Sequence, residues 1–346
     1  METVLGFAIV LAGAVCGGSF GLPSKYVKKG TPWEVLWGPF FLFVTILIPT
    51  VLGPVIVKDF FGVYGQAGLG AMVLPLIFGL LWGLGSMTLG MSFAFIGLSL
   101  AYALNYGLQI ATGAMVPMLI HNADAVLTGK GLVVIGGVVA CLLGVVASGR
   151  AAMLKERDLK AASAGDSPAG DGVKRPKMLI GVIIAIASGV LCACYAVSAS
   201  FAGAVGAAAE KLGNQGYQAT WAVMAVIVWG GAASACLYCL VQLCRNKTWG
   251  HFGKPGIGRT LMLALIMAVL HDGAIFLFGL GYQKLGDLGI SVGYAVFMSF
   301  AILVGTFHGF RTGEWKGASR DSISWLVMGV ASLVLGVYIL GVGNSM

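Results

Sequence analysis

Residues 137–149 read GVVACLLGVVASG, and residues 329–341 read GVASLVLGVYILG. Neither stretch contains a charged side chain, and the two share Gly, Val, Leu, Gly, Val and Gly in register at an offset of 192. The same offset aligns an earlier pair of segments, and an offset of 175 aligns residues near the start of each half. These alignments place Gly97, Ser99, Tyr102 and Ala103 on Gly289, Ser291, Tyr294 and Ala295, and Gly6, Ala12 and Val15 on Gly181, Ala187 and Val190. One gapless offset across two successive apolar segments indicates an internal repeat.

Apolar segments of this kind recur along the whole chain of 346 residues. The composition is 58% hydrophobic and only 10% charged, whereas soluble domains carry about 25% charged residues. A membrane-spanning helix needs about 20 mostly apolar residues. We therefore predict an all-α membrane protein with ten transmembrane helices at residues 3–23, 31–57, 69–95, 98–120, 131–149, 178–204, 218–243, 259–281, 288–309 and 323–342. Only Met1 and Glu2 precede the first segment, which lacks the basic start of a signal peptide and is predicted to remain as a span.

The basic residues segregate between the loops that these ten spans define. Of the 21 Lys and Arg residues, all but four fall on the side that holds the loop after the first span. The exceptions are Lys58, Lys130, Lys211 and Lys284. Because cytoplasmic loops are enriched in Lys and Arg, the basic side is predicted to be cytoplasmic. Both termini are then periplasmic, and the net charge of +8 reflects topology rather than nucleic-acid binding.

The longest loop divides the chain into two halves of five spans each. We predict a first five-helix repeat at residues 1–149, a cytoplasmic linker at 150–177 and a second five-helix repeat at 178–346. Because five is odd, the second half must be inserted upside down relative to the first. Inverted repeats of this type are typical of secondary transporters, which bind substrate near the middle of the membrane between the repeats.

No pattern typical of an enzyme, a metal site or a cofactor site is present. The four histidines are scattered, and Cys236 and Cys239 form a C-x-x-C without a second pair at zinc-site spacing. The glycine-rich stretch 253–260 does not match a phosphate-binding loop. We therefore expect no catalytic residues, no metal and no cofactor.

Three ionisable residues are candidates for proton coupling, because such residues are costly inside a membrane. His271 and Asp272 fall near the middle of the eighth span, where a carboxylate beside an imidazole suits reversible protonation. The alternative is a neutral, hydrogen-bonded pair that only packs helices. Glu34 follows Thr31 by three residues, which fits a capping box that opens a helix. A role for Glu34 in a cytoplasmic gate or in coupling is the other possibility.

Neutral polar and aromatic residues are candidates for substrate binding. Their hydroxyl, amide and phenol groups suit an uncharged polyhydroxyl ligand, and an indole face can stack on the apolar face of a sugar ring. For each of them, packing between helices is the alternative. The candidates are Tyr102, Asn105, Tyr106 and Gln109 on the fourth span, Ser291 and Tyr294 on the ninth, and the mid-membrane residues Trp82 and Trp229.

Several short motifs carry a resemblance to the L-rhamnose/proton symporter family of the drug/metabolite transporter superfamily. They are Lys25-Tyr26-Val27-Lys28-Lys29 followed by Trp33-Glu34 and Trp37, Trp82-Gly83-Leu84-Gly85 with Gly90, Gly97-Leu98-Ser99, Gly149-Arg150-Ala151, Leu154-Lys155-Glu156-Arg157, and Glu314-Trp315. The resemblance covers nearly the full chain. It implies uptake of a deoxy-sugar such as L-rhamnose, driven by protons, across a bacterial inner membrane by a ten-span fold. The partners expected are therefore a sugar, protons and membrane lipid. An exporter of drugs or metabolites with the same fold is the alternative.

Overall fold

The structure is a computed structural model that describes residues 2–121, 123–164, 178–285 and 293–346. The regular elements of this part of the chain are helices. In chain order they are α1 (Glu2–Ser19), η1 (Leu22–Tyr26), α2 (Trp33–Leu42), η2 (Phe43–Leu47), α3 (Ile48–Ile56), α4 (Phe60–Ala67), α5 (Leu69–Ile96), α6 (Leu98–His121), η3 (Ala123–Leu127), α7 (Gly129–Ala164), α8 (Met178–Cys192), α9 (Cys194–Phe201), α10 (Gly203–Lys211), α11 (Gly216–Arg245), η4 (Trp249–Gly253), α12 (Ile257–Leu285), α13 (Tyr294–Arg311) and α14 (Arg320–Ser345).

Nine segments of the described chain are long and apolar enough to cross a membrane. Eight of them begin and end within four residues of predicted spans; the fifth runs from Gly129 to Leu159 instead of ending at residue 149. Helix α7 continues to Ala164, so part of the predicted linker 150–177 is helical, and residues 165–177 lie outside the described residues. The predicted span 288–309 corresponds to a shorter apolar helix, Val296–Arg311. Residues 286–292, which include the start of that predicted span, lie outside the described residues.

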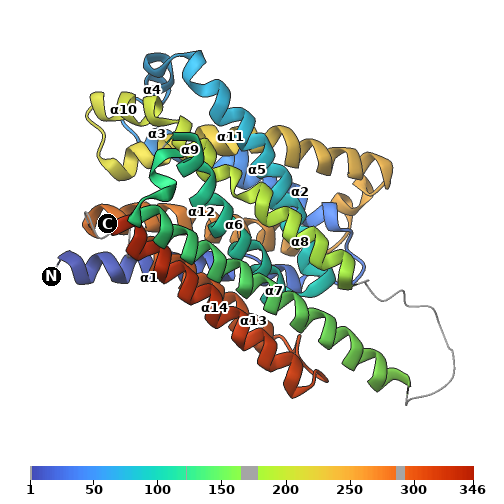
Figure 1. Cartoon of the computed structure of the whole chain (residues 1–346). Coiled ribbons are helices and arrows are strands. Elements are labelled where there is room, and N and C mark those ends of the chain that lie inside the picture. The colour runs from blue at the N-terminus through green and yellow to red at the C-terminus, as the bar shows by residue number, and fades with distance from the viewer. Residues whose placement is uncertain (1, 122, 165–177, 286–292) are drawn as a thin grey trace.

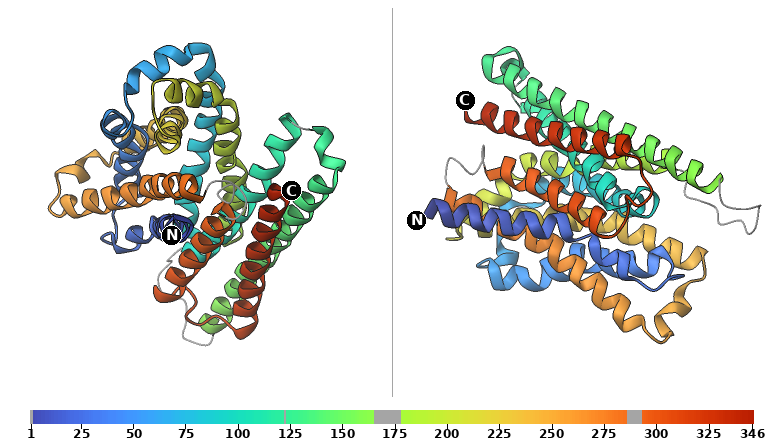
Figure 2. Two further views of the ribbon diagram at one scale, coloured as in Figure 1. Left: turned by 90° about the vertical axis from the view of Figure 1, so that its left-hand side faces the viewer. Right: turned by 90° about the horizontal axis from the view of Figure 1, so that it is seen from below.

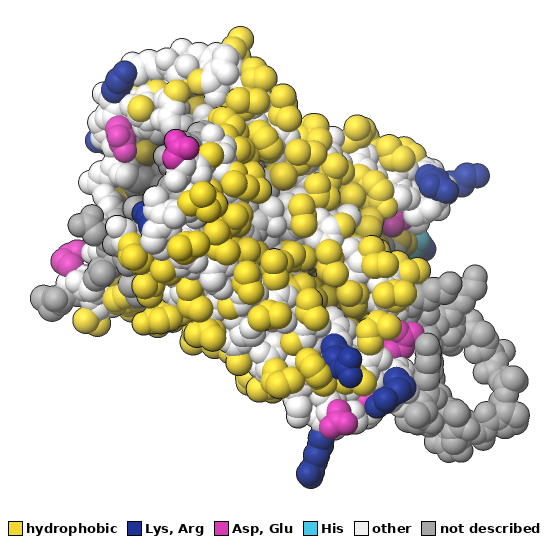
Figure 3. Space-filling view, viewed as in Figure 1, with side chains coloured by type: hydrophobic (Ala, Val, Ile, Leu, Met, Phe, Trp, Pro, Cys, Tyr) yellow, Lys and Arg dark blue, Asp and Glu magenta, His cyan; other side chains and the backbone are white. Residues whose placement is uncertain are grey.

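The helices form one bundle whose two termini lie at the same end (Figure 1). An ion pair between Lys284 and Glu2, 3.2 Å apart, joins the end of α12 to the start of α1 at that end. Hydrophobic side chains cover the middle of the face seen in Figure 3, and Lys and Arg side chains lie towards its ends. A bundle with an apolar belt and charged ends is the form expected of a protein that spans a membrane.

Helices α7 and α14 pack side by side over much of their length (Figures 1 and 2). A Cβ atom added at Gly144 would lie 2.8 Å from the carbonyl oxygen of Gly329, and one added at Gly336 would lie 2.8 Å from that of Gly137. Only glycine allows the two backbones to approach so closely. The Ser332 hydroxyl donates to the carbonyl oxygen of Ala140 at 2.8 Å, and these two residues are 192 positions apart.

Helices α1 and α8 each pack against two long helices. Helix α1 packs against α12 and α13, whereas α8 packs against α5 and α6. Both are interrupted near their C-terminal ends: α1 stops at Ser19 before η1, and α8 stops at Cys192 before α9 begins at Cys194. Ser19 and Cys194 are 175 positions apart, which is the offset that aligns the two segments in sequence. The interrupted helices bring Phe20 and Tyr195 to the interior.

Candidate functional site

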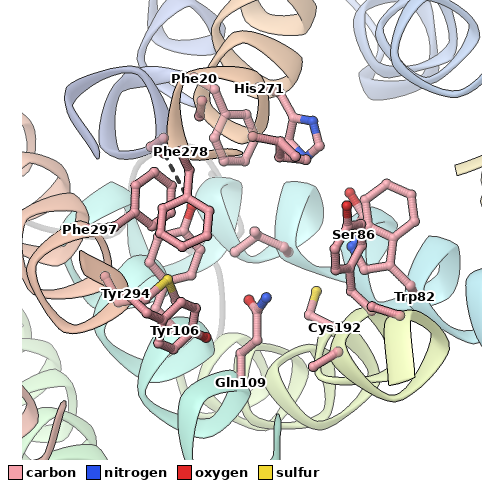
Figure 4. Close-up of a pocket in the computed structure, with 18 residues that line it drawn as sticks. Phe20, Trp82, Ser86, Tyr106, Gln109, Cys192, His271, Phe278, Tyr294 and Phe297 are labelled. Atoms are coloured by element: carbon pink, nitrogen blue, oxygen red, sulfur yellow. Dashed lines mark hydrogen bonds between the residues drawn. The ribbon is translucent and has the colours of Figure 1, made fainter. Parts of the chain in front are cut away.

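A cavity of about 300 Å³ lies inside the bundle, between the interrupted helices α1 and α8–α9 (Figure 4). Helices from both halves of the chain contribute to its walls. The lining includes Gly17 of α1 and Phe20 just after it, Trp82 and Ser86 of α5, Tyr106 and Gln109 of α6, Cys192 of α8, Tyr195 of α9, His271 and Phe278 of α12, and Tyr294 and Phe297 of α13. A volume of this size is at the lower end of the range of small-molecule sites.

Aromatic rings and a few neutral polar groups make up the walls of this cavity. The indole of Trp82 lies 5.9 Å from the ring of Tyr195 in an edge-to-face arrangement. The Gln109 amide points into the cavity from α6, opposite the aromatic residues of α12 and α13 (Figure 4). The Tyr106 hydroxyl donates to the carbonyl oxygen of Gly17 at 3.2 Å. No Lys, Arg, Asp or Glu of the described residues lines this cavity.

His271 lines the cavity, and Asp272, which is not part of the lining, is its hydrogen-bond partner. His271 Nδ1 is 2.9 Å from Asp272 Oδ1, and the Asp272 carboxylate is buried. Its other oxygen, Oδ2, has no hydrogen-bond partner among the residues that the structure describes. Because Nδ1 faces the carboxylate, Nε2 is the imidazole nitrogen left for exchange with the cavity.

Aromatic side chains surround the imidazole of His271. Its ring centroid lies 5.3 Å from that of Phe20, 5.9 Å from that of Trp82 and 6.1 Å from that of Phe40. The rings of Phe20 and Phe40 meet the imidazole edge to face, and the indole of Trp82 is tilted against it. The contact with Trp82 also joins the ionisable pair directly to the wall of the cavity.

Tightly packed rings lie beyond Phe20, towards the end of the bundle opposite the termini. Phe20 contacts Phe93 and Tyr102 at centroid distances of 6.0 and 5.8 Å. The Tyr102 hydroxyl accepts a hydrogen bond from the backbone N–H of Gly21 at 2.9 Å, and its side chain is fully buried. Gly21 has no space for a side chain, because an added Cβ would lie 2.7 Å from the Phe93 ring. These contacts close the cavity on that side.

A charged contact lies near these rings, at the end of the bundle opposite the termini. Glu314, in the loop between α13 and α14, forms an ion pair with Lys25 at 3.0 Å and accepts hydrogen bonds from the backbone N–H groups of Leu98 and Ser99 at the start of α6. Burial of the carboxylate by itself raises its pKa, but the Lys25 ammonium and these N–H donors outweigh burial. The pKa of Glu314 consequently lies below its ordinary value.

The structure brings together some of the residues predicted from sequence and separates others. Trp82, Gln109, Tyr294 and His271 line the cavity, with Asp272 behind His271. Ser291 lies outside the described residues.

Tyr102, Asn105 and Trp229 lie in contacts between helices instead of lining the cavity. Tyr102 bonds to Gly21, as described above. The Asn105 side-chain amide donates to the Ser188 hydroxyl at 2.7 Å, and Trp229 Nε1 donates to the Thr50 hydroxyl at 3.2 Å. The alternative of packing between helices, raised from the sequence, fits these positions.

Glu34 does not form the predicted capping box. Helix α2 begins after Pro32 without a side-chain cap, and Glu34 instead accepts hydrogen bonds from the Asn246 amide at 3.0 Å and the Thr248 hydroxyl at 2.8 Å. These partners follow α11, more than 200 residues away in sequence, so local spacing could not reveal them. The capping prediction for Glu34 is wrong, because this distant loop occupies the carboxylate.

Several residues of the site were missed by sequence reasoning. Ser86, Cys192 and Phe278 line the cavity but look like ordinary residues of apolar helices. Tyr195, which the offset of 175 aligns with Phe20, also lines the cavity. His308 was treated as isolated, yet its Nε2 lies 2.9 Å from the hydroxyl of Ser19, where α1 ends.

Comparison with known proteins identifies the family. The family model for the L-rhamnose-proton symport protein (RhaT) matches residues 1–346. The chain belongs to the L-rhamnose-proton symport protein family. It is 25% identical over 348 residues to an L-rhamnose-proton symporter of Yersinia pestis bv. Antiqua (strain Antiqua), covering 99% of this chain and 98% of the relative. It is also 25% identical over 344 residues to one of Salmonella paratyphi B (strain ATCC BAA-1250 / SPB7), covering 97% and 96%.

Membership in this symport family and the nine candidate spans make the chain a multi-pass membrane protein of a transport family. The motifs that carried the resemblance lie largely around the closed end of the cavity. Trp37 stacks on Trp33 at 5.6 Å and packs against Gly90, where an added Cβ would lie 2.8 Å from its ring. Lys25 and Glu314 form the ion pair described above. In this family member, these motifs therefore hold together the end of the bundle opposite the termini.

Proposed function

We propose that the protein is a proton-coupled sugar symporter that imports L-rhamnose or a related deoxy-sugar by alternating access across the bacterial inner membrane. The observation that carries this proposal is the interior cavity, in which a neutral polar and aromatic lining meets the ionisable pair His271–Asp272. Family membership supports the substrate class, because the curated relatives are L-rhamnose-proton symporters.

The lining of the cavity suits a neutral sugar. A sugar ring has an apolar face that can stack on the indole of Trp82 and hydroxyl groups that can bond to Gln109 and Ser86, all of which line the cavity. Amide and hydroxyl groups both donate and accept hydrogen bonds without demanding a charge on the ligand. A deoxy-sugar also has a methyl group, for which the rings of Phe278 and Phe297 offer an apolar contact.

The pair His271–Asp272 is proposed to carry the proton. When His271 is neutral, the pair has a net charge of minus one; when it takes up a proton, the pair becomes neutral. Moving a charged group through the middle of a membrane is costly, so protonation favours the change of conformation. Because Trp82 contacts both the cavity and His271, proton and sugar can influence each other without a long relay. Glu34 is the second candidate for coupling, although its carboxylate is bound to Asn246 and Thr248.

The fold is proposed to contain ten spans in two inverted repeats, residues 1–149 and 178–346, with residues 150–177 between them on the cytoplasmic side. Contacts between equivalent residues support the repeat. Cys141 and Leu333, like Ala140 and Ser332, are 192 positions apart and in contact, as expected where a pseudo-twofold axis passes between α7 and α14. The segregation of Lys and Arg supports periplasmic termini. In this orientation, the rings beyond Phe20 lie between the cavity and the cytoplasm.

Uptake into proteoliposomes tests the proposal. Purified protein should accumulate labelled L-rhamnose when an inward pH gradient is imposed, and a protonophore that collapses the gradient should abolish accumulation. Facilitated exchange without accumulation would contradict proton coupling. Gradient-driven expulsion of a cationic drug, with no response to sugar, would favour the exporter with the same fold.

A further inference from the structure

A second cavity lies at the end of the bundle opposite the termini. It has a volume of about 230 Å³ and is bounded by two loops that are far apart in sequence. One loop, residues 28–31, lies between η1 and α2, and the other segment, residues 251–257, runs from within η4 to the first residue of α12. It shares no lining residue with the interior cavity.

Basic side chains dominate the polar lining of this second cavity. Lys28 and Lys29 come from the first loop, and His251 and Lys254 come from the second. Within the described ranges, no Asp or Glu forms an ion pair with any of these three lysines. The nearby carboxylate of Glu34 is buried and already accepts two hydrogen bonds from Asn246 and Thr248, between α11 and η4. The cavity therefore gathers three ammonium groups that have no ion pair among the described residues, and the Glu34 carboxylate lies near His251.

Hydrogen bonds hold part of this basic lining in place. His251 Nδ1 lies 3.2 Å from the carbonyl oxygen of Thr248, so Nδ1 carries the hydrogen and donates it. Nε2 then accepts from the ammonium of Lys254 at 3.1 Å. The Thr248 hydroxyl donates in turn to Glu34 at 2.8 Å. Glu34 therefore anchors to α2 the loop that carries His251 and Lys254, and this keeps the two basic loops together.

We propose that this cavity binds a phosphate group, carried either by a lipid headgroup or by a soluble phosphorylated metabolite. A phosphate dianion has three terminal oxygens and can accept hydrogen bonds from several ammonium groups at once. The volume exceeds the need of one phosphate and leaves room for the part of a headgroup or sugar attached to it. Because the cavity lies on the side proposed to be cytoplasmic, both sources of phosphate can reach it. Binding would bridge the end of the interrupted first span to α12, the helix that carries His271.

Thermal unfolding of the full-length protein in detergent tests this site. Inorganic phosphate should raise the unfolding temperature above that in chloride at equal ionic strength. Combined replacement of the lysines (Lys28→Gln, Lys29→Gln, Lys254→Gln) should weaken the apparent affinity for phosphate by about tenfold or more, because several charged hydrogen bonds are lost. Lys316→Gln is the matched control, since Lys316 lies at the same end but lines a different pocket. If the combined variant does not fold, the three single variants are compared by the same criterion.

Nanodiscs separate the two sources of phosphate. Phosphatidylcholine discs are compared with discs that also contain phosphatidic acid, with and without added inorganic phosphate. Lysine-dependent stabilisation by phosphatidic acid assigns the site to lipid, and lysine-dependent stabilisation by phosphate alone assigns it to a soluble ligand. Equal responses to phosphate and chloride, together with no effect of phosphatidic acid, would overturn the proposal. An undiminished phosphate response in the lysine variants would overturn it as well.

Discussion

The ammonium of Lys25 lies 3.0 Å from the carboxylate of Glu314, and the same carboxylate binds the first backbone N–H groups of α6. Lys25 belongs to η1, after the interruption of the first span, whereas Glu314 lies in the loop between α13 and α14. Three segments, η1, the start of α6 and the loop between α13 and α14, therefore meet at this carboxylate, near the rings around Phe20. Opening of the cavity on this side requires that at least some of these contacts separate.

Glu314→Gln should destabilise the closed end of the bundle. The amide keeps one acceptor oxygen but loses the ion pair with Lys25, so unfolding should become easier by about 2 kcal/mol, the size of a hydrogen bond to a charged group. Thermal unfolding of the purified protein measures the change. Glu210→Gln is the control, since Glu210 is exposed at the end of the bundle where the termini lie.

The ion pair between Lys25 and Glu314 should make the stability of the fold depend on pH. The pKa of Glu314 is below its ordinary value of 4.5, so its stabilising contribution is complete above that value and is lost as the pH falls through the lowered pKa. The difference in unfolding temperature between the parent and Glu314→Gln should be largest near neutral pH and shrink in acid. A difference that stays constant into acid would show that the charge of Glu314 does not stabilise the fold.

Asp272→Asn should uncouple sugar movement from the proton gradient. The amide can still contact His271 Nδ1, but it cannot balance an imidazolium, so His271 would no longer hold the proton in the membrane interior. One proton moving down 100 mV supplies about 2.3 kcal/mol, or roughly 50-fold accumulation. The variant should lose this accumulation and retain sugar exchange between equal compartments.

Proteoliposomes report both properties, and Asp321→Asn serves as a control with an exposed acid. Full accumulation by Asp272→Asn would move the proposed coupling role to Glu34.

Trp82→Ala should weaken sugar binding, whereas Trp229→Ala should not. Trp82 lines the cavity and touches His271, so its loss removes the proposed stacking surface and should cost about 1.4 kcal/mol, or tenfold in affinity. Trp229 packs on Phe60 and Tyr64, away from the lining. Tryptophan fluorescence or isothermal calorimetry with L-rhamnose measures the affinities. Equal losses in both variants would indicate a general effect on folding.

The contrast between these two tryptophans shows what sequence could and could not predict. Span positions were predictable because a membrane imposes a length of about 20 apolar residues on each helix. Trp82 and Trp229 each fall near the middle of such a span, so depth does not distinguish them. Which one faces the cavity depends on the rotation and packing of each helix. In an apolar helix without a polar face, the sequence does not indicate which side faces the interior.

Contacts between residues that are far apart in sequence could not be predicted either. Glu34 looked like a local cap, but its carboxylate binds a loop beyond α11. By contrast, the offset of 192 was visible because the equivalent glycines sit in the contact itself, where only glycine fits. Sequence therefore pointed to a helix contact where close backbone approach limits the choice of residue, and it missed contacts that many residue types could make.

Substitutions in the contact between α7 and α14 test this packing directly. Gly144→Ala would place a methyl group 2.8 Å from the carbonyl oxygen of Gly329, and Gly336→Ala would place one 2.7 Å from the backbone nitrogen of Cys141. Because backbone atoms cannot move aside cheaply, each variant should lose about 1–3 kcal/mol of stability. Gly136→Ala is the matched control on α7, since nothing lies within 4 Å of the added atom. Similar unfolding temperatures for all three variants would contradict close backbone packing; losses at Gly144 and Gly336 alone would support the pseudo-twofold contact between the two halves.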